Sequence, residues 1–210
     1  PDWIASGIYP PVATVNQLRT RSNRVPTILR TLRMINAPIK ERDIIMAIVE
    51  IQDLWKSFRN RRKVVEAVRG VNLAIQEGEV FGFLGPNGAG KTTTLRMLTT
   101  LLRPDKGRAT VAGFDLRNEP DRVRTCIGYV SQNGGADSAL TGRENAIMQA
   151  RFYGFPVEKA RKRATELLEN LEMTTFADRP ARTYSGGQRR RLDLALGLVH
   201  QPRLLFLDEP

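Results

Sequence analysis

The stretch GPNGAGKT at residues 85–92 decides the fold, because it satisfies the pattern G-x-x-x-x-G-K-[ST] in full. Its three glycines let the backbone curl so that successive N–H groups converge on an anion. The apolar run before the loop predicts a strand over residues 80–84, and a helix is predicted to begin near Lys91. A strand, a glycine-rich loop and a helix in this order are typical of a phosphate-binding loop.

The loop assigns roles to single side chains. Lys91 is expected to reach the β- and γ-phosphates of a nucleotide as a point charge, which makes it a catalytic candidate as well. The Thr92 hydroxyl is expected to ligate Mg²⁺. The residues expected to contact the nucleotide here are Gly85, Asn87, Gly88, Ala89, Gly90, Lys91, Thr92 and Thr93.

The chain ends in an apolar run with two acids, RLLFLDEP at 203–210. Such a run predicts a strand buried in a parallel sheet, whose carboxylates emerge at the edge where α/β folds bind ligands. Asp208 is placed to hold Mg²⁺, and Glu209 is placed to polarise the attacking water as general base. An acidic strand end is a weak signal alone and becomes strong beside a phosphate-binding loop.

The segment Ser185-Gly186-Gly187-Gln188 has two local interpretations. Ser followed three residues later by Gln is a capping box, which only starts a helix. A helix N-terminus with two glycines and a hydroxyl is also an anion receptor, the second in this chain.

Four segments in this order, GPNGAGKTT, IGYVSQ, YSGGQ and LLFLDEP, resemble the Walker A, Q-loop, signature and Walker B motifs of ABC ATPases. The resemblance covers residues 46–210. LTGREN at 140–145 and TYSGGQRRRLDLALGLV at 183–199 are similar to the ATPases of daunorubicin-resistance-type ABC exporters, with Tyr184 replacing the commoner Leu of the signature.

The resemblance implies further roles. Gln132 would contact Mg²⁺ or the attacking water and communicate with a transmembrane permease subunit. Phe58 would stack on adenine, although Trp55 is close enough to compete for that role. In a head-to-tail pair with a second ATPase domain, the γ-phosphate bound to the opposing subunit would be contacted by Ser185, Gly186, Gly187 and Gln188.

The expected fold is α/β: a P-loop NTPase core with a mixed or parallel sheet, an antiparallel β subdomain, and a helical lobe over about 133–190. In that lobe, Thr141 and Glu144 form a capping box that predicts a helix through about Phe152. A following helix, after Pro156, is predicted to bury the apolar face Val157, Ala160, Ala164, Leu167, Leu168 and Leu171. Residues 1–45, basic and punctuated by prolines, are expected to lie outside the domain, which would begin at Met46.

Composition limits the class of protein. The 210 residues are 41% apolar and 26% charged, as in globular proteins. No apolar run approaches the ~20 residues that cross a bilayer, and the single cysteine, Cys126, excludes an internal disulfide. The net charge of +11 is dispersed, so no nucleic-acid partner is expected. A cytoplasmic ATPase, peripheral on the inner face of the membrane, fits these features and the resemblance.

The expected function is ATP binding and hydrolysis, with Mg²⁺, that powers export of a small drug-like molecule by an ABC transporter. Two alternatives stay open: a soluble ABC ATPase that acts on DNA or the ribosome, and a nucleotide-binding module without catalysis. The D-loop and switch histidine of the family would follow Pro210, and His200 precedes the Walker B motif. We therefore expect the 210-residue chain to hydrolyse ATP weakly or not at all.

Overall fold

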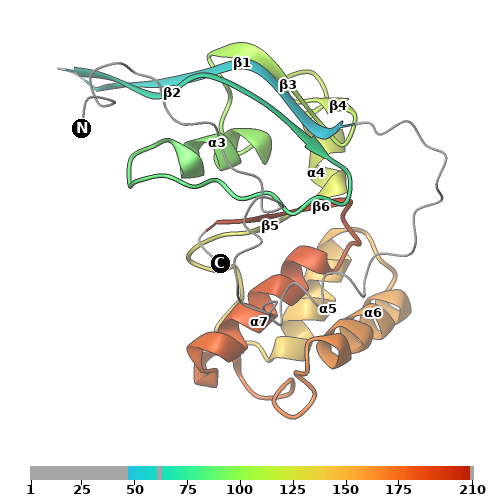
Figure 1. Cartoon of the computed structure of the whole chain (residues 1–210). Coiled ribbons are helices and arrows are strands. Elements are labelled where there is room, and N and C mark those ends of the chain that lie inside the picture. The colour runs from blue at the N-terminus through green and yellow to red at the C-terminus, as the bar shows by residue number, and fades with distance from the viewer. Residues whose placement is uncertain (1–46, 61–62, 209–210) are drawn as a thin grey trace, which may run out of the picture.

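The computed structural model describes residues 47–60 and 63–208. A four-stranded antiparallel sheet, in the order β2-β1-β3-β4, forms one side of the molecule (Figure 1). The apolar residues Val49, Ile51 and Leu54 face its core and are almost fully buried. The antiparallel subdomain predicted from the sequence is therefore confirmed. Its strands are β1 (Ala47–Asn60), β2 (Lys63–Gln76), β3 (Lys106–Val111) and β4 (Phe114–Asp115).

A parallel pair of strands forms the second sheet. β5 (Ile127–Val130) pairs with β6 (Leu204–Leu207), with Val130 opposite Leu207. Helices α3 (Lys91–Leu98) and α4 (Pro120–Cys126) lie between this pair and the antiparallel sheet (Figure 1). Buried residues of both sheets and both helices form one apolar cluster, so the two sheets share a core.

A helical lobe packs on the other side of β5 and β6 (Figure 1). It contains α5 (Gly142–Phe152), α6 (Val157–Asn170), a short 3₁₀ helix (Ala181–Thr183) and α7 (Gly186–Leu198). The Thr141–Glu144 capping box is present, and α5 ends at Phe152 as predicted. The predicted apolar face of α6 is buried except at Val157. Val157, the first residue of α6, is 44% exposed.

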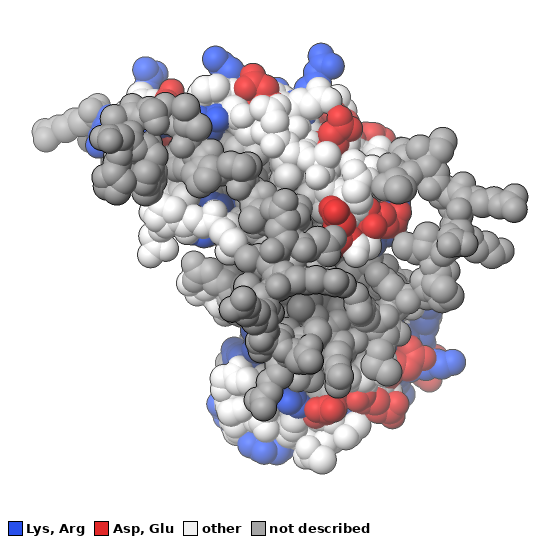
Figure 2. All heavy atoms as spheres, viewed as in Figure 1, with Lys and Arg blue, Asp and Glu red and all other residues white. Residues whose placement is uncertain are grey.

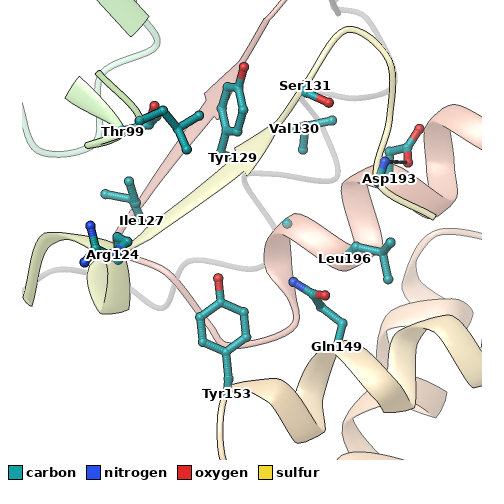
Figure 3. Close-up of a pocket in the computed structure, with 13 residues that line it drawn as sticks. Thr99, Arg124, Ile127, Tyr129, Val130, Ser131, Gln149, Tyr153, Asp193 and Leu196 are labelled. Atoms are coloured by element: carbon teal, nitrogen blue, oxygen red, sulfur yellow. Dashed lines mark hydrogen bonds between the residues drawn. The ribbon is translucent and has the colours of Figure 1, made fainter. Parts of the chain in front are cut away.

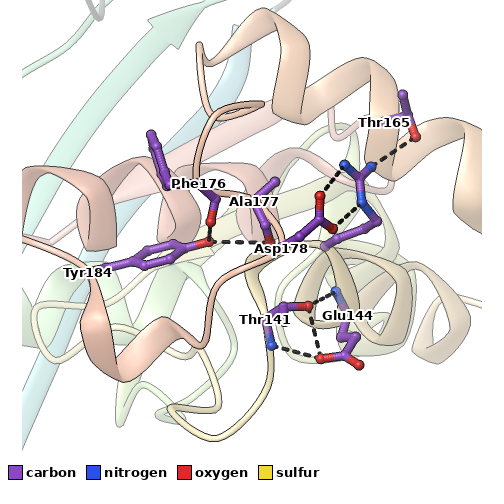
Figure 4. A network of polar contacts seen from close by, with 8 residues as sticks. Thr141, Glu144, Thr165, Phe176, Ala177, Asp178 and Tyr184 are labelled. Atoms are coloured by element: carbon purple, nitrogen blue, oxygen red, sulfur yellow. Dashed lines mark hydrogen bonds and ion pairs between the residues drawn. The ribbon is translucent and has the colours of Figure 1, made fainter.

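Side-chain hydrogen bonds join α5, α6 and the segment between α6 and α7 (Figure 4). Arg143 of α5 holds Asp178 through two hydrogen bonds, Nε–Oδ1 at 2.7 Å and Nη2–Oδ2 at 3.1 Å, and also donates to Thr165 of α6. The Tyr184 hydroxyl donates to the carbonyl of Phe176 at 2.8 Å, and the two rings meet edge to face. Tyr184, which stands where the signature motif commonly has Leu, therefore makes a hydrogen bond that Leu could not make.

Helix α7 approaches β5 closely because both elements have a glycine at the contact. A Cβ on Gly128 would overlap the carbonyl oxygen of Gly197 and lie 2.8 Å from Leu205 Cδ1. Apolar residues of α7 and its C-cap are buried: Leu192, Ala195, Leu196 and Val199. This contact joins the helical lobe to the parallel strands.

The strand predicted over residues 80–84 is wrong. Residues 79–86 have an irregular backbone, and Val80 and Leu84 are more than half exposed. Phe81 and Phe83 do pack against the shared core, which accounts for the apolar pattern. A strand in a parallel sheet needs neighbours that pair with its backbone, and no strand of the described residues pairs with this segment.

The described surface carries charges of both signs. Figure 2 shows Lys and Arg side chains scattered among acidic ones at both ends of the molecule, in agreement with the dispersed charge inferred from the sequence. Within residues 47–60 and 63–208, no helix is long and apolar enough to cross a bilayer. Residues 1–45, Met46 and Glu209 lie outside the described part of the chain, so the predictions made for them stay predictions.

Candidate functional site

The glycine-rich loop packs against β2 just before α3 begins. Gly90, the N-cap of α3, has φ 84°, a left-handed conformation that favours glycine. A Cβ at this position would also overlap the carbonyl oxygen of Ala67. Both the backbone angle and the space therefore require glycine at position 90, where the loop turns into the helix.

Lys91 folds back over its own loop. Its Nζ donates to the carbonyl of Gly85 at 2.6 Å and to that of Pro86 at 3.0 Å. Residues 84–89 are exposed, while Thr92 and Thr93 are half-buried at the start of α3. The positive charge of Lys91 and the N-terminal end of α3 therefore face the same exposed loop, which suits a polyphosphate.

Thr92 and Asp208 meet, although 116 positions separate them in the chain. The Thr92 hydroxyl donates to Asp208 Oδ1 at 3.1 Å, and the Tyr129 hydroxyl donates to Oδ2 at 3.3 Å. Asp208 is 5% exposed, and its N–H donates to the carbonyl of Val130 across the parallel ladder. Burial, together with the charge of Asp208, raises the pKa of the Tyr129 hydroxyl, which therefore stays protonated as a donor.

The Thr92 and Asp208 oxygens suit a magnesium ion. Mg²⁺ prefers hard oxygen ligands and is usually held by one or two protein groups together with substrate phosphates. A hydroxyl and a carboxylate oxygen 3.1 Å apart, next to a phosphate-binding loop, provide such a pair. These residues therefore fit the metal predicted from the sequence.

Gln132 lies at the same edge as Asp208. It is exposed and follows β5 by two residues, whereas Asp208 directly follows β6. Because Val130 pairs with Leu207 in a parallel ladder, both side chains leave the sheet at its carboxyl end. The catalytic role assigned to Gln132 is compatible with this position and stays a prediction.

The two aromatic candidates for adenine differ in their surroundings. Trp55 donates its indole N–H to Asp53 Oδ1 at 2.7 Å and is half-buried. Phe58 is 45% exposed, with Lys56 Nζ 5.8 Å from its ring centroid. Phe58 pairs with Val65 on β2, the strand on which the loop packs. Its exposure favours Phe58 as the stacking residue.

Ser185 caps α7 in the helical lobe, away from α3 (Figure 1). Its hydroxyl accepts from the Gln188 N–H at 3.3 Å, and the Gln188 side chain accepts from the Ser185 N–H at 3.0 Å. The capping box is thus confirmed, and the structure does not join this segment to the phosphate loop within one chain. Gly186 and Gly187 are exposed, with open space where a Cβ would lie.

The arginines that follow the signature segment contact the chain itself. Arg189 donates to the carbonyls of Ala181 and Ala136, and Arg191 pairs with Glu172. Arg190 donates to the carbonyl of Ser131. Each of these three side chains therefore makes contacts within its own chain.

A hollow of about 330 Å³ lies beside the site, between β5, α7 and α5 (Figure 3). Tyr129, Ser131 and Asp193 are among the residues that line it, and no residue of the phosphate loop does. The structure thus reveals three side chains near the site to which the sequence motifs assigned no role: Tyr129, Arg190 and Asp193. In the sequence, the one indication that Asp193 has a special role is that it is an acid on an otherwise apolar helix face.

Comparisons with known proteins agree with this geometry. The ABC transporter family model matches residues 68–210. The chain is 49% identical over 162 residues to the daunorubicin/doxorubicin resistance ATP-binding protein DrrA of Streptomyces peucetius, covering 77% of this chain and 48% of that protein. It is 53% identical to DrrA2 of Streptomyces coeruleorubidus, over 77% of this chain and 49% of that one. The chain spans about half the length of these curated relatives.

A solved structure has the same fold. The ATP-binding cassette MJ0796, in a dimeric post-hydrolysis state with ADP and phosphate, aligns with a TM-score of 0.70 and 30% identity. The alignment covers 77% of this chain and 74% of that one. The expected α/β fold is therefore confirmed. The match over more than half of the sequence and the identity to these relatives show that the chain belongs to the ABC transporter family.

Proposed function

We propose that the chain binds MgATP at the loop of residues 85–93 and hydrolyses it, and that hydrolysis powers export of a small drug-like molecule. The contact between Thr92 and Asp208 carries this proposal, because it joins the phosphate-binding loop to the buried acid at the sheet edge. Membership of the ABC transporter family and the names of the drug-resistance relatives support it.

The residues of the site divide the work. The loop amides and Lys91 bind the phosphates. Thr92 and Asp208 would hold Mg²⁺, which would supply positive charge next to the reacting phosphate. Gln132 orients the attacking water, and Glu209 accepts its proton. Phe58 stacks on the adenine ring.

We also propose that two such domains pair head to tail and act on a membrane permease. The exposed N-terminus of α7, with Ser185, Gly186 and Gly187, is a second anion receptor remote from the phosphate loop of its own chain. The γ-phosphate of a nucleotide bound to a partner domain would be the anion that this helix N-terminus binds. The domain would then sit at the inner face of the membrane, with the permease supplying the drug pathway.

Phosphate release from MgATP tests this proposal. We expect Lys91→Ala and Asp208→Asn each to lower the rate by about 10²-fold or more, because each removes charge stabilisation at the reacting phosphate. Lys162→Ala, which removes an exposed lysine of α6, is the matched control and keeps the rate of the unmodified chain. Phosphate release that is measurable and equal in all four proteins would overturn the proposal.

A further inference from the structure

The loop that contains Gln132 is held at both ends by one helix. At its start, the Ser131 carbonyl accepts a hydrogen bond from Arg190 Nη1 at 3.2 Å. At its end, the Gly135 N–H donates to Asp193 Oδ1 at 3.0 Å. Arg190 and Asp193 are three residues apart on α7, so they lie on the same face of that helix. Figure 3 shows Asp193 reaching from α7 toward the segment that follows β5.

The loop is also fixed internally, so that a shift at its ends moves it as a unit. The Ser131 hydroxyl donates to the Gly134 carbonyl at 3.0 Å, and the Gly134 N–H donates to the Ser131 carbonyl at 3.2 Å. A Cβ on Gly134 would lie 2.7 Å from Asp193 Oδ2, so the loop backbone rests directly on this carboxylate. Gly134 has φ 71°, which also favours glycine.

The carboxylate of Asp193 is a strong attachment point. It is 6% exposed, and a charge-assisted hydrogen bond in a buried place is stronger than one between neutral groups. The loop is bound on its other side to the sheet, since the Val130 carbonyl accepts from the Asp208 N–H at 3.0 Å. The position of Gln132 relative to Asp208 is therefore set jointly by the β5–β6 ladder and by α7.

We propose that Arg190 and Asp193 are positioning residues that couple α7 to Gln132. This inference rests on the proposed function, in which Ser185 at the start of α7 engages the γ-phosphate on a partner domain. A movement of α7 on that engagement is passed through Arg190 and Asp193 to the Gln132 loop. The loop then carries the Gln132 side chain into the position that orients water.

Hydrogen exchange and steady-state kinetics on the full chain test the coupling together. We expect Asp193→Ala and Arg190→Ala to speed amide exchange over residues 131–136 by about tenfold or more, since each removes a hydrogen bond of a charged group. We expect kcat for MgATP to fall by about tenfold while KM stays within about twofold, because binding is left intact. Asp193→Asn keeps an acceptor oxygen and should restore most of kcat.

Arg191→Ala is the matched control, because Arg191 lies on the same helix and contacts Glu172 instead of the loop. It should leave both the exchange of residues 131–136 and kcat unchanged. The coupling is refuted if the amides of residues 131–136 exchange in Asp193→Ala and Arg190→Ala at the rate of the unmodified chain. It is also refuted if these variants loosen the loop without lowering kcat.

If Asp193→Ala fails to fold, Arg190→Ala and Asp193→Asn decide whether α7 is coupled to the loop. If the unmodified chain shows no turnover, as the sequence predicts for residues 1–210, the exchange data decide whether α7 holds the loop, and titration with MgATP decides the proposed function.

Discussion

Gly142 opens α5 in direct contact with the phenol of Tyr184. A Cβ at this position would overlap the Tyr184 hydroxyl and lie 3.3 Å from the Ala177 carbonyl. We therefore expect Gly142→Ala to lower the free energy of unfolding by roughly 1–3 kcal/mol, because the displaced hydroxyl loses its acceptor at Phe176. Urea denaturation measures this. Gly82→Ala, where no atom lies within 4 Å of the added Cβ, is the control and should change little.

A second prediction at this scale concerns Asp105. A hydrogen bond from Lys56, followed by one from the Ser57 N–H, lowers the pKa of this carboxyl from 3.8 to about 2. Because the folded pKa is depressed, Asp105 stabilises the fold above pH 3.8, and this contribution is lost as the pH falls toward 2. The side chain is 39% exposed, so the contribution is below about 1 kcal/mol.

Comparison with Asp105→Asn isolates this contribution from the other acids. The unmodified chain should be the more stable of the two at pH 5.5, and the difference in unfolding free energy should shrink at pH 2.5. A difference that stayed the same at both pH values would show that the ion pair with Lys56 does not set this pKa.

At the scale of elements, the contact between α7 and β5 decides how the lobe meets the sheet. Gly128→Ala would force a methyl group into the Gly197 carbonyl and push the helix off the strand. We expect a loss of unfolding free energy of roughly 1–3 kcal/mol or more, together with a lower kcat, because α7 also holds the Gln132 loop. Thermal unfolding and phosphate release measure the two effects. Unchanged values of both would mean that the helix and strand tolerate a wider separation.

The elements also show what could be predicted from the sequence. The capping boxes at Thr141 and Ser185 were predictable because each depends on residues only three positions apart. The strand over residues 80–84 was not, because an apolar run does not reveal whether a neighbouring strand pairs with it. The bond between Gly135 and Asp193 spans 58 positions and follows no motif, so only the fold reveals it.

At the scale of the whole molecule, the sheets and the helical lobe carry different parts of the proposed nucleotide site. The sheet side carries the groups for the chain's own nucleotide, and the lobe carries the segment proposed to contact the nucleotide of a partner domain. The sheet side brings Thr92 and Asp208 together, whereas Ser185 is exposed at the start of α7, a helix of the lobe. The phosphate loop and the acid were predicted as a pair because the motifs require it, although 116 positions separate them. The positioning contacts of α7 join the two parts through the loop that holds Gln132.

The central claim is that residues 85–93 and Asp208 together bind a magnesium nucleotide, and calorimetric titration with MgATP tests it most directly. The unmodified chain and the Lys162→Ala control should give the same saturable binding. Lys91→Ala should bind at least about tenfold more weakly, which corresponds to about 1.4 kcal/mol of binding free energy. Identical titrations of Lys91→Ala and the unmodified chain would contradict the claim.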